Sequence, residues 1–279
     1  PSVSDISVSK ATIVADGVDS TVVTVTVRDE DGNPVSGKSV AIGCTGSGNT
    51  IRQPGAVTDA LGRAVGSVVS TVAEGKTIGA TVDAVSLTET VPVSFIAGPF
   101  DPSVSDISVS KATIVADGVD STVVTVVVRD AEGNPISGSV VTLECTGSGN
   151  EIRQPVGLTG SDGRAVGSVK STVAEGKTIR SRANGVYLSE IAPVTFVPGP
   201  FDPGASEIQV DKTAAIADGV DAIGATVYVR DADSNPLAGV LVTIECTGSG
   251  NAITQPAAAT GADGRAVGYV RSTVAEIKS

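Results

Sequence analysis

The stretch TVVTVTVRDEDGNP, residues 21–34, decides the fold class of this chain. Val23, Val25 and Val27 occupy alternate positions, with threonines between them. Because successive side chains of a strand point to opposite faces of a sheet, this period of two predicts a β-strand whose three valines face inward. The run DGNP that follows is rich in residues that tight turns favour. The stretch therefore predicts a half-buried strand that ends in a tight turn.

The whole chain of 279 residues repeats itself at a period of 101 residues. Residues 1–25 return unchanged as 102–126, and a more diverged copy begins at Pro203. The third copy stops at Ser279, which aligns with Thr77, so it has no counterpart of the last two strands of the repeat. About 100 residues can bury a core of their own, so each copy is predicted to be one domain. The predicted domains are 1–101, 102–202 and 203–279.

Comparison of the copies shows which face of each strand tolerates exchange, because the exchanges recur at every second residue. Thr26 becomes Val127 and then Tyr228, as an outward position can. In two later strands, the exchanged positions also alternate with those that we assign to the core. The residues predicted to face the core there are Ala64, Gly66, Val68, Ile78, Ala80 and Val82.

Clusters of glycine, aspartate, asparagine and proline divide each copy into about seven short strands, and no period of 3.6 residues is present. This pattern predicts an all-β chain of tandem immunoglobulin-like β-sandwich domains, with a fibronectin-like topology as the near alternative. The seams between copies read GPFDP at 98–102 and 199–203. Because proline fixes its own φ and restricts the residue before it, these linkers are predicted to be short and stiff.

Composition and charge exclude several function classes. Histidine, methionine and tryptophan are absent, aromatic residues make up 3% of the chain and apolar residues 41%. Zero histidine removes the commonest general base and metal ligand. A net charge of -12 opposes nucleic-acid binding and a polybasic membrane contact, and no apolar run approaches the ~18 residues of a spanning helix. We therefore expect no enzyme, no nucleic-acid partner, no direct membrane insertion and no cofactor, and predict no catalytic, cofactor-binding or metal residues.

Six short motifs carry a family resemblance. They are SVSK at 7–10, ADGVD at 15–19, VTVRD at 25–29, DGNPV at 31–35, GRAV at 62–65 and STVA at 70–73. Together they resemble the bacterial immunoglobulin-like group 1 domains of the intimin and invasin adhesins, over almost the whole chain. The resemblance implies rigid extracellular spacer domains between an outer-membrane anchor and a distal binding tip. Similar modules also occur in other bacterial surface proteins and in phage virion proteins, and the cysteine in each copy departs from the pattern.

One cysteine recurs in each copy, as Cys44, Cys145 and Cys246. It stands two residues after an apolar strand position, at Ile42 in the first copy, so it is predicted to point inward. A domain with one cysteine cannot close an internal disulfide, and partners in separate sandwiches lie beyond the ~7 Å limit between Cα atoms. We interpret these residues as small buried hydrophobes, and the alternative is a reactive or intermolecular thiol.

Acidic loops invite a calcium interpretation. Oxygen ligands at alternate positions from Asp29 resemble the start of an EF-hand loop, but the sixth position is Pro34 and the twelfth is Val40, where glycine and glutamate are needed. We therefore predict a plain turn at 29–33. The recurrent carboxylates Asp16, Asp19 and Asp101 leave calcium at the domain seams as an alternative.

Three other patterns have a structural explanation. The TGSGN run at 45–49, 146–150 and 247–251 has no following helix or lysine to make a phosphate loop, so we predict an ordinary loop. The DGR runs at 162–164 and 263–265 are predicted turns, and LGR stands at 61–63. Tyr228 and Tyr269 are predicted to form an outward cross-strand contact, and a stacked sugar is the alternative.

These observations predict a non-enzymatic stalk or spacer array of a bacterial cell-surface adhesin, extracellular, holding a distal binding domain away from the cell. A host-surface or protein partner would be bound through other domains. The alternative is a structural subunit of an extracellular fibre or phage virion, with self-association through the incomplete third repeat. Because Pro1 aligns with an internal repeat boundary and no signal peptide opens the chain, we interpret it as an excerpt of a longer protein whose third repeat continues beyond Ser279.

Overall fold

Alternating β-branched and polar residues produce short strands along the whole chain. The computed structural model describes residues 4–279, and within that range it contains strands and no α-helix. In repeat 1 (residues 1–101), seven strands have four or more residues, as predicted, and the shorter β2 and β8 are additional. The strands are β1 Asp5–Val8, β2 Thr12–Val14, β3 Thr21–Thr26, β4 Val40–Cys44, β5 Asn49–Arg52, β6 Arg63–Ser70, β7 Gly75–Val82, β8 Val85–Ser86 and β9 Val91–Ile96.

Repeat 2 (residues 102–202) reproduces the same order of strands, as its sequence requires. Repeat 3 (residues 203–279) has four strands. The strands of repeat 2 are β10 Asp106–Val109, β11 Thr113–Val115, β12 Ser121–Val127, β13 Val141–Cys145, β14 Asn150–Arg153, β15 Arg164–Ser171, β16 Gly176–Ala183, β17 Val186–Tyr187 and β18 Ala192–Val197. Those of repeat 3 are β19 Glu207–Val210, β20 Ile223–Tyr228, β21 Asn251–Thr254 and β22 Arg265–Ser272.

Each complete repeat is a sandwich of two sheets. In repeat 1 the first sheet has the order β1-β3-β6-β5 and is antiparallel throughout. The second has the order β2-β9-β7-β4, with β8 on β7, and β2 runs parallel to β9. The first sheet thus holds the ABED strands of a constant-type immunoglobulin domain, and the second holds CFG. This order favours the immunoglobulin topology over the fibronectin-like alternative.

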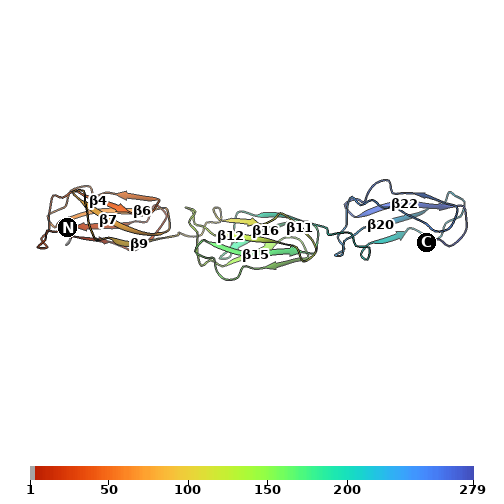
Figure 1. Ribbon diagram of the computed structural model, residues 1–279, viewed down its shortest axis with the longest axis horizontal. Helices are drawn as coiled ribbons and strands as arrows, with labels where there is room; N and C mark the ends of the chain where they lie inside the picture. Colours follow the sequence, from red (N-terminus) through yellow and green to blue (C-terminus); the bar gives the residue numbers. More distant parts are fainter. Residues whose placement is uncertain (1–3) are drawn as a thin grey trace.

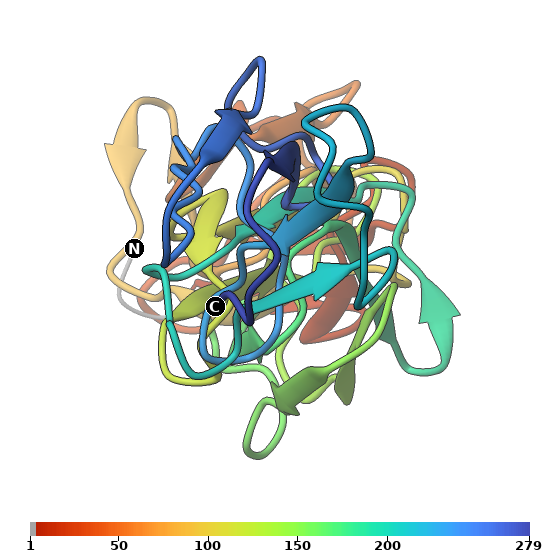
Figure 2. The same ribbon diagram turned by 90° about the vertical axis from the view of Figure 1, so that its right-hand side faces the viewer.

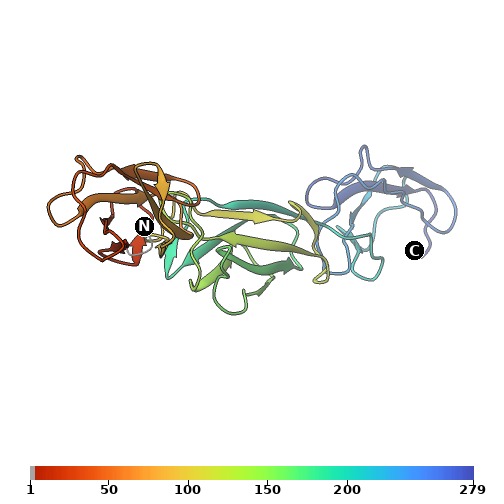
Figure 3. The same cartoon turned by 60° about the vertical axis from the view of Figure 1, so that its left-hand side comes forward.

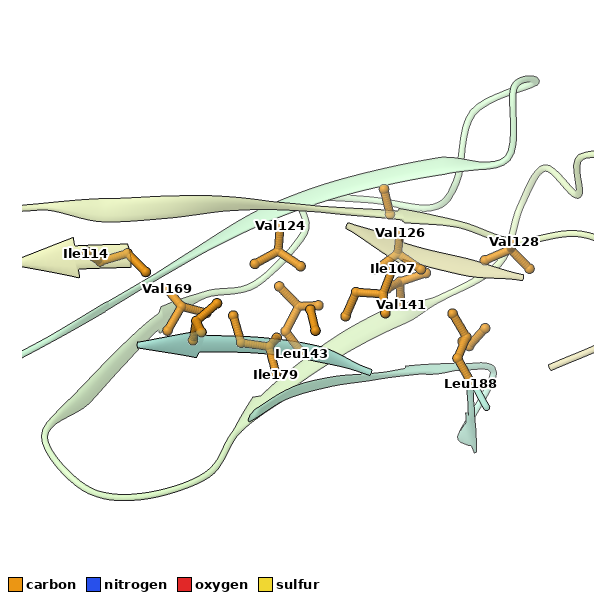
Figure 4. Packing of buried hydrophobic residues seen from close by; sticks show 14 of the residues in the cluster. Ile107, Ile114, Val124, Val126, Val128, Val141, Leu143, Val169, Ile179 and Leu188 are labelled. Atoms are coloured by element: carbon orange, nitrogen blue, oxygen red, sulfur yellow. The ribbon is translucent and has the colours of Figure 1, made fainter. Parts of the chain in front are cut away.

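The core lies between the two sheets, and the predicted faces are confirmed. Val23, Val25 and Val27 are buried, as are Ala64, Val68, Ile78 and Ala80, and Val82 packs partly buried against them. Figure 4 shows the equivalent packing in repeat 2, where Val124 and Val126 from β12 face Leu143 of β13 and Ile179 of β16. Burying apolar area of this kind contributes roughly 25 cal/mol per Å² and is the main stabilising term of each sandwich.

Repeat 3 differs more from the complete repeats than the sequence predicted. Its sheet β19-β20-β22-β21 matches the first sheet of repeat 1. The counterparts of β2 and β4 are present in the sequence, yet they form no strand within the described residues. The reason is pairing, because β4 bonds only to β7 and β2 only to β9, and repeat 3 has neither partner. Ile208 is consequently 62% exposed, whereas Ile107 is 4% exposed.

The three repeats lie end to end in a row, with their strands along its length (Figure 1). The row persists after a turn of 60° (Figure 3), and a view along it superimposes the repeats (Figure 2). The linker is attached to the repeat that follows it: Phe100 packs against the core of repeat 2, and the Asp101 N–H donates to Arg129 O at 2.9 Å. Little free chain is left between one repeat and the next.

Candidate functional site at the joints between repeats

The most extensive side-chain contacts between repeats are made by Asn134, in the turn after β12. We call the contact between consecutive repeats a joint. Asn134 is 6% exposed. Its Nδ2 donates to Thr71 O at 3.1 Å and to Ala15 O at 3.4 Å, and its Oδ1 accepts from the Ala73 N–H at 2.8 Å. One amide side chain of repeat 2 therefore contacts three backbone groups of repeat 1, and because Nδ2 has two hydrogens and also donates to Asp130, one of these hydrogens is shared between two acceptors.

Asp130 completes the joint and holds Asn134 in place. Its Oδ2 accepts from the Gly98 N–H at 2.8 Å and from Asn134 Nδ2 at 2.9 Å. Its Oδ1 accepts from the Asn134 backbone N–H at 2.7 Å. A carboxylate that is 1% exposed is costly unless it is hydrogen-bonded, and these donors meet that requirement. The aspartate thus orients the asparagine and also binds the preceding repeat.

The second joint repeats the first. Asp231 and Asn235 replace Asp130 and Asn134, and both are buried. Each contact between the repeats has a distance within 0.1 Å of its counterpart. The bonds are Asn235 Nδ2 to Thr172 O at 3.0 Å and to Ala116 O at 3.4 Å, Ala174 N–H to Asn235 Oδ1 at 2.8 Å, and Gly199 N–H to Asp231 Oδ2 at 2.8 Å.

A buried lysine fixes the loop that the joint uses. Lys76 Nζ donates to Ser47 O at 2.7 Å and to Glu74 Oε1 at 2.6 Å, and lies 5.7 Å from the centroid of the Phe95 ring. Glu74 Oε1 also accepts from the Ser47 N–H at 2.8 Å, and these bonds lower the pKa of the Glu74 carboxyl. Residues 71–74, which carry two of the joint's backbone groups, are thereby held against the TGSGN loop.

Sequence reasoning predicted the turn at 29–33 and its equivalents but missed the joint. The turn is confirmed by the Gly32 N–H donating to Asp29 O at 3.1 Å. A signal was present, because the aspartate and the asparagine are the same in all three copies while Glu30 and Asp31 change.

Cys44 and Cys145 point toward the core at the ends of β4 and β13, as predicted, but each is only half-buried, and the half-buried Cys246 lies in no strand. All are free thiols, and the Sγ of Cys44 lies 3.6 Å from Thr45 O. Burial raises the pKa of the Cys44 and Cys145 thiols. A raised pKa reduces the thiolate fraction at neutral pH, which opposes the reactive alternative.

The carboxylates considered for calcium bind groups of the protein. Asp19 pairs with Lys10 and accepts from the Val14 N–H at 2.9 Å. Asp16 accepts from two loop N–H groups, and Asp101 from Ser103 Oγ at 2.6 Å. These bonds lower the pKa of each of the three carboxyls. Within residues 4–279, no three cysteine or carboxylate side chains come together as a metal site requires.

The predicted cross-strand contact of Tyr228 with Tyr269 is wrong. Strands β20 and β22 are neighbours as expected, but the register places Tyr228 opposite Arg265 and Tyr269 opposite Gly224. The two rings are therefore separated by four positions along the sheet. The Arg230 guanidinium carbon lies 5.6 Å from the centroid of the Tyr228 ring instead.

Another exposed polar cluster lies on repeat 2, and sequence reasoning did not find it. The Tyr187 hydroxyl donates to Glu144 Oε2 at 2.6 Å, and Arg182 stacks on the Tyr187 ring at 4.0 Å. Arg182 Nε also pairs with Glu144 at 3.1 Å. These three side chains therefore bind one another across β13, β16 and β17.

The TGSGN loops and the DGR turns lie where they were predicted. The TGSGN run is the connection from β4 to β5, and Asn49 Nδ2 donates to Thr45 O at 3.0 Å within it. In the DGR turns, the Arg164 N–H donates to Asp162 Oδ1 at 3.1 Å.

The described residues form no helix that is long and apolar enough to span a bilayer.

Comparison with known proteins extends these observations. The model of the family described as bacterial Ig-like domain (group 1) matches residues 3–96, 104–197 and 205–279. The inverse autotransporter adhesin YeeJ of Escherichia coli K12 is 28% identical over 245 residues, which is 85% of this chain and 10% of that protein. The chain thus spans about a tenth of the length of this curated relative.

Solved structures show the same fold at lower identity. The Escherichia coli adhesin FdeC matches with a TM-score of 0.64 at 20% identity, covering 97% of this chain and 88% of that one. Yersinia pseudotuberculosis InvD matches with a TM-score of 0.60 at 21% identity, covering 99% and 81%. Since the family model accounts for nearly all of the three repeats, the chain belongs to the bacterial Ig-like domain (group 1) family.

Proposed function

We propose that this chain is a stiff, non-enzymatic spacer in a bacterial cell-surface adhesin. Its three repeats hold a distal binding domain away from the cell, and any host-surface or protein partner is bound outside these repeats. The observation that carries the proposal is the joint, whose hydrogen bonds recur at both contacts between repeats. No residue is assigned a catalytic, metal or cofactor role.

Stiffness follows from how the joint is anchored. Asn134 and Asp130 contact four separate backbone positions of repeat 1, so swivelling about the linker breaks several bonds at once. Each such bond contributes about 1 kcal/mol, and charged acceptors contribute more. Because the linker keeps the two faces close, the contact costs less entropy than association of separate molecules would. Residues 100–101 at the end of repeat 1 are fixed to repeat 2, and the Gly98 N–H is bound by Asp130, so little of the linker is free to move.

The adhesin context is supported by the relatives. YeeJ is an inverse autotransporter adhesin, and FdeC is an adhesin with the same fold. A net charge of -12 suits a solvated array, since charge of one sign opposes self-association. We place the three domains at 1–101, 102–202 and 203–279 as part of this proposal.

Small-angle scattering tests the spacer function. The chain should scatter as a rod, because both joints are closed. Replacing both joint asparagines, Asn134→Ala and Asn235→Ala, should shorten the mean length and add the signature of flexible links. The matched control is Asn33→Ala, which alters the same turn in repeat 1, where no preceding repeat is contacted within the described residues.

Two results would contradict the proposal. A flexible or folded-back profile for the unaltered chain would show that the joints do not hold the row. An unchanged rod in the double variant would show that the asparagines do not provide the stiffness. The control must remain rod-like for the comparison to count.

A further inference from the structure

Strand β4 lies at the edge of the second sheet of repeat 1, so one side of its backbone has no neighbouring strand. Edge strands are commonly protected from pairing with another chain by lysine or proline. The five residues of β4, VAIGC, include no proline and no charged residue. This edge is therefore open to strand addition unless side chains from elsewhere cover its backbone groups.

The side chain of Gln53 covers the middle of this edge. Its Oε1 accepts from the Ile42 N–H at 2.7 Å, and its Nε2 donates to Ile42 O at 2.8 Å. In an antiparallel sheet, a residue exchanges the same two bonds with the residue opposite it. Because a primary amide has the donor and the acceptor of a peptide group, Gln53 takes the place that a neighbouring strand would have at Ile42.

Two further side chains cover the ends of the edge. Asn49 Nδ2 donates to Cys44 O at 3.5 Å, and Thr58 Oγ1 accepts from the Lys38 N–H at 3.0 Å. The Thr58 N–H also donates to Lys38 O at 2.9 Å. We call Asn49, Gln53 and Thr58, with their counterparts in the other repeats, the edge cap. All three belong to the stretch between β4 and β6, which carries the outermost strand of the first sheet.

The edge cap has the same residues in every repeat. Gln154 binds the Leu143 N–H at 2.7 Å and Leu143 O at 2.9 Å, and Gln255 binds both groups of Ile244 at 2.8 Å. In repeat 3 no second sheet forms within the described residues, yet Ile244 is only 5% exposed. The glutamine therefore holds its partner in place even where the sheet around that partner is missing.

We propose that the edges of β4 and β13 are docking surfaces for the same edge of a second copy of this chain, and that the edge cap keeps them closed. Without Gln53, the N–H and C=O of Ile42 can pair with another strand by β-augmentation. The occupant is a second copy, because identical antiparallel edges are self-complementary about a twofold axis. This inference concerns contacts between arrays, whereas the proposed spacer function concerns contacts along one array.

A chain with Gln53→Met and Gln154→Met tests the proposal. Methionine keeps the length of the side chain but offers no amide to the backbone, and both glutamines are exposed, so the core is unaltered. Sedimentation is measured in about 0.15 M salt, which screens the repulsion between chains of net charge -12. The variant should associate at a concentration at least about tenfold lower than the unaltered chain, which carries the same repeat 3.

Two other chains serve as controls. Gln209→Met adds a methionine at the remaining glutamine, which is exposed on β19 and lies outside the edge cap, and it should sediment as the unaltered chain does. The pair Gln53→Glu and Gln154→Glu loses the bond to the carbonyl but places a charge at each edge. Because charge on an edge opposes pairing, this variant should not associate more than the unaltered chain.

Hydrogen exchange at the Leu143 amide, measured where the chains are monomeric, reports whether the edge is uncovered. It should be at least about tenfold faster in the methionine variant. Faster exchange without association would mean that the glutamines only connect the two sheets, and it would overturn the proposal. Unchanged exchange, or equal association of Gln209→Met or of the glutamate pair, would overturn it as well. The spacer function survives each of these results, because the joints contain no glutamine and scattering tests them separately.

Discussion

Lys177 shows how one side chain supports a contact in which it takes no direct part. Its side chain is fully buried, and its Nζ donates to Ser148 O and to Glu175 Oε1, each at 2.6 Å. The hydrogen bonds from Lys177 and from the Ser148 N–H lower the pKa of the Glu175 carboxyl. A lowered pKa means that the ionised carboxylate stabilises the fold above its ordinary pKa, and that this stabilisation is lost as the pH falls through the lowered value. The loop next to joint 2 should therefore loosen in acid.

Replacing Lys177 by alanine should lower the free energy of unfolding of repeat 2 by about 2–3 kcal/mol, since charged hydrogen bonds and buried methylenes are lost together. Calorimetry of the chain measures it. The control is Lys170→Ala, which removes an exposed ion pair with Glu151 at 3.1 Å and should cost less than about 1 kcal/mol. Equal effects of the two changes would mean that the buried bonds of Lys177 contribute no more to the free energy of unfolding than an exposed ion pair does.

Some contacts of individual residues could not be predicted from the sequence. The inward valines followed from a period of two, because burial acts on each position separately. The joint did not, because it depends on which backbone groups of another repeat come within hydrogen-bond distance of one amide. The error over Tyr228 and Tyr269 has the same origin: alternation assigns a face, whereas register depends on turn geometry.

At the scale of the strand, Gly167 of β15 stands where no larger residue fits. A Cβ on it would lie 2.5 Å from Arg153 O in β14 and 2.6 Å from Leu143 Cδ1 in the opposite sheet. The corresponding glycines of β6 and β22 meet the same two obstacles. Comparison of the copies predicted the inward face of this position, but not that a neighbouring backbone excludes a side chain.

Gly167→Ala should destabilise repeat 2 by about 1–3 kcal/mol through overpacking. Thermal unfolding measures the effect, because ~1 kcal/mol moves the midpoint of such a domain by roughly 4–8 °C. Gly176→Ala is the matched control, since a Cβ there meets no heavy atom within 4 Å and the change should stay within about 0.5 kcal/mol. A midpoint for Gly167→Ala as high as that of the control would contradict the close approach of β14.

For the whole molecule, the number of repeats could be predicted from the sequence. Which strands of the third repeat form depends on whether their pairing partners are present. Strand count alone suggested that two strands are lost. Sheet order shows that the partners of those strands also lose their structure, so one entire sheet is absent from the described part of repeat 3. Val270 is only partly covered there, whereas its counterpart Val169 is fully buried.

The fragment 203–279 should consequently unfold at a lower temperature, and less cooperatively, than the same fragment extended by a copy of residues 179–201. The extension restores the partners for the counterparts of β2 and β4 and covers apolar surface. Circular dichroism during heating compares the two fragments. If the bare fragment melts cooperatively as a monomer at the same temperature as the extended one, the pairing argument and the immunoglobulin assignment of repeat 3 are both wrong.

The position of the two halves of the joint has an evolutionary consequence. Every repeat encodes the turn with aspartate and asparagine at one end and the loops that this turn binds at the other. Unequal crossing-over between such repeats in a gene inserts or deletes a whole unit, and the new boundary is compatible at once because every copy keeps the aspartate and asparagine of the turn and the sequence of the loops that they bind. Lineages can therefore vary the reach of the array in steps of one repeat, and no compensating substitution has to arise first.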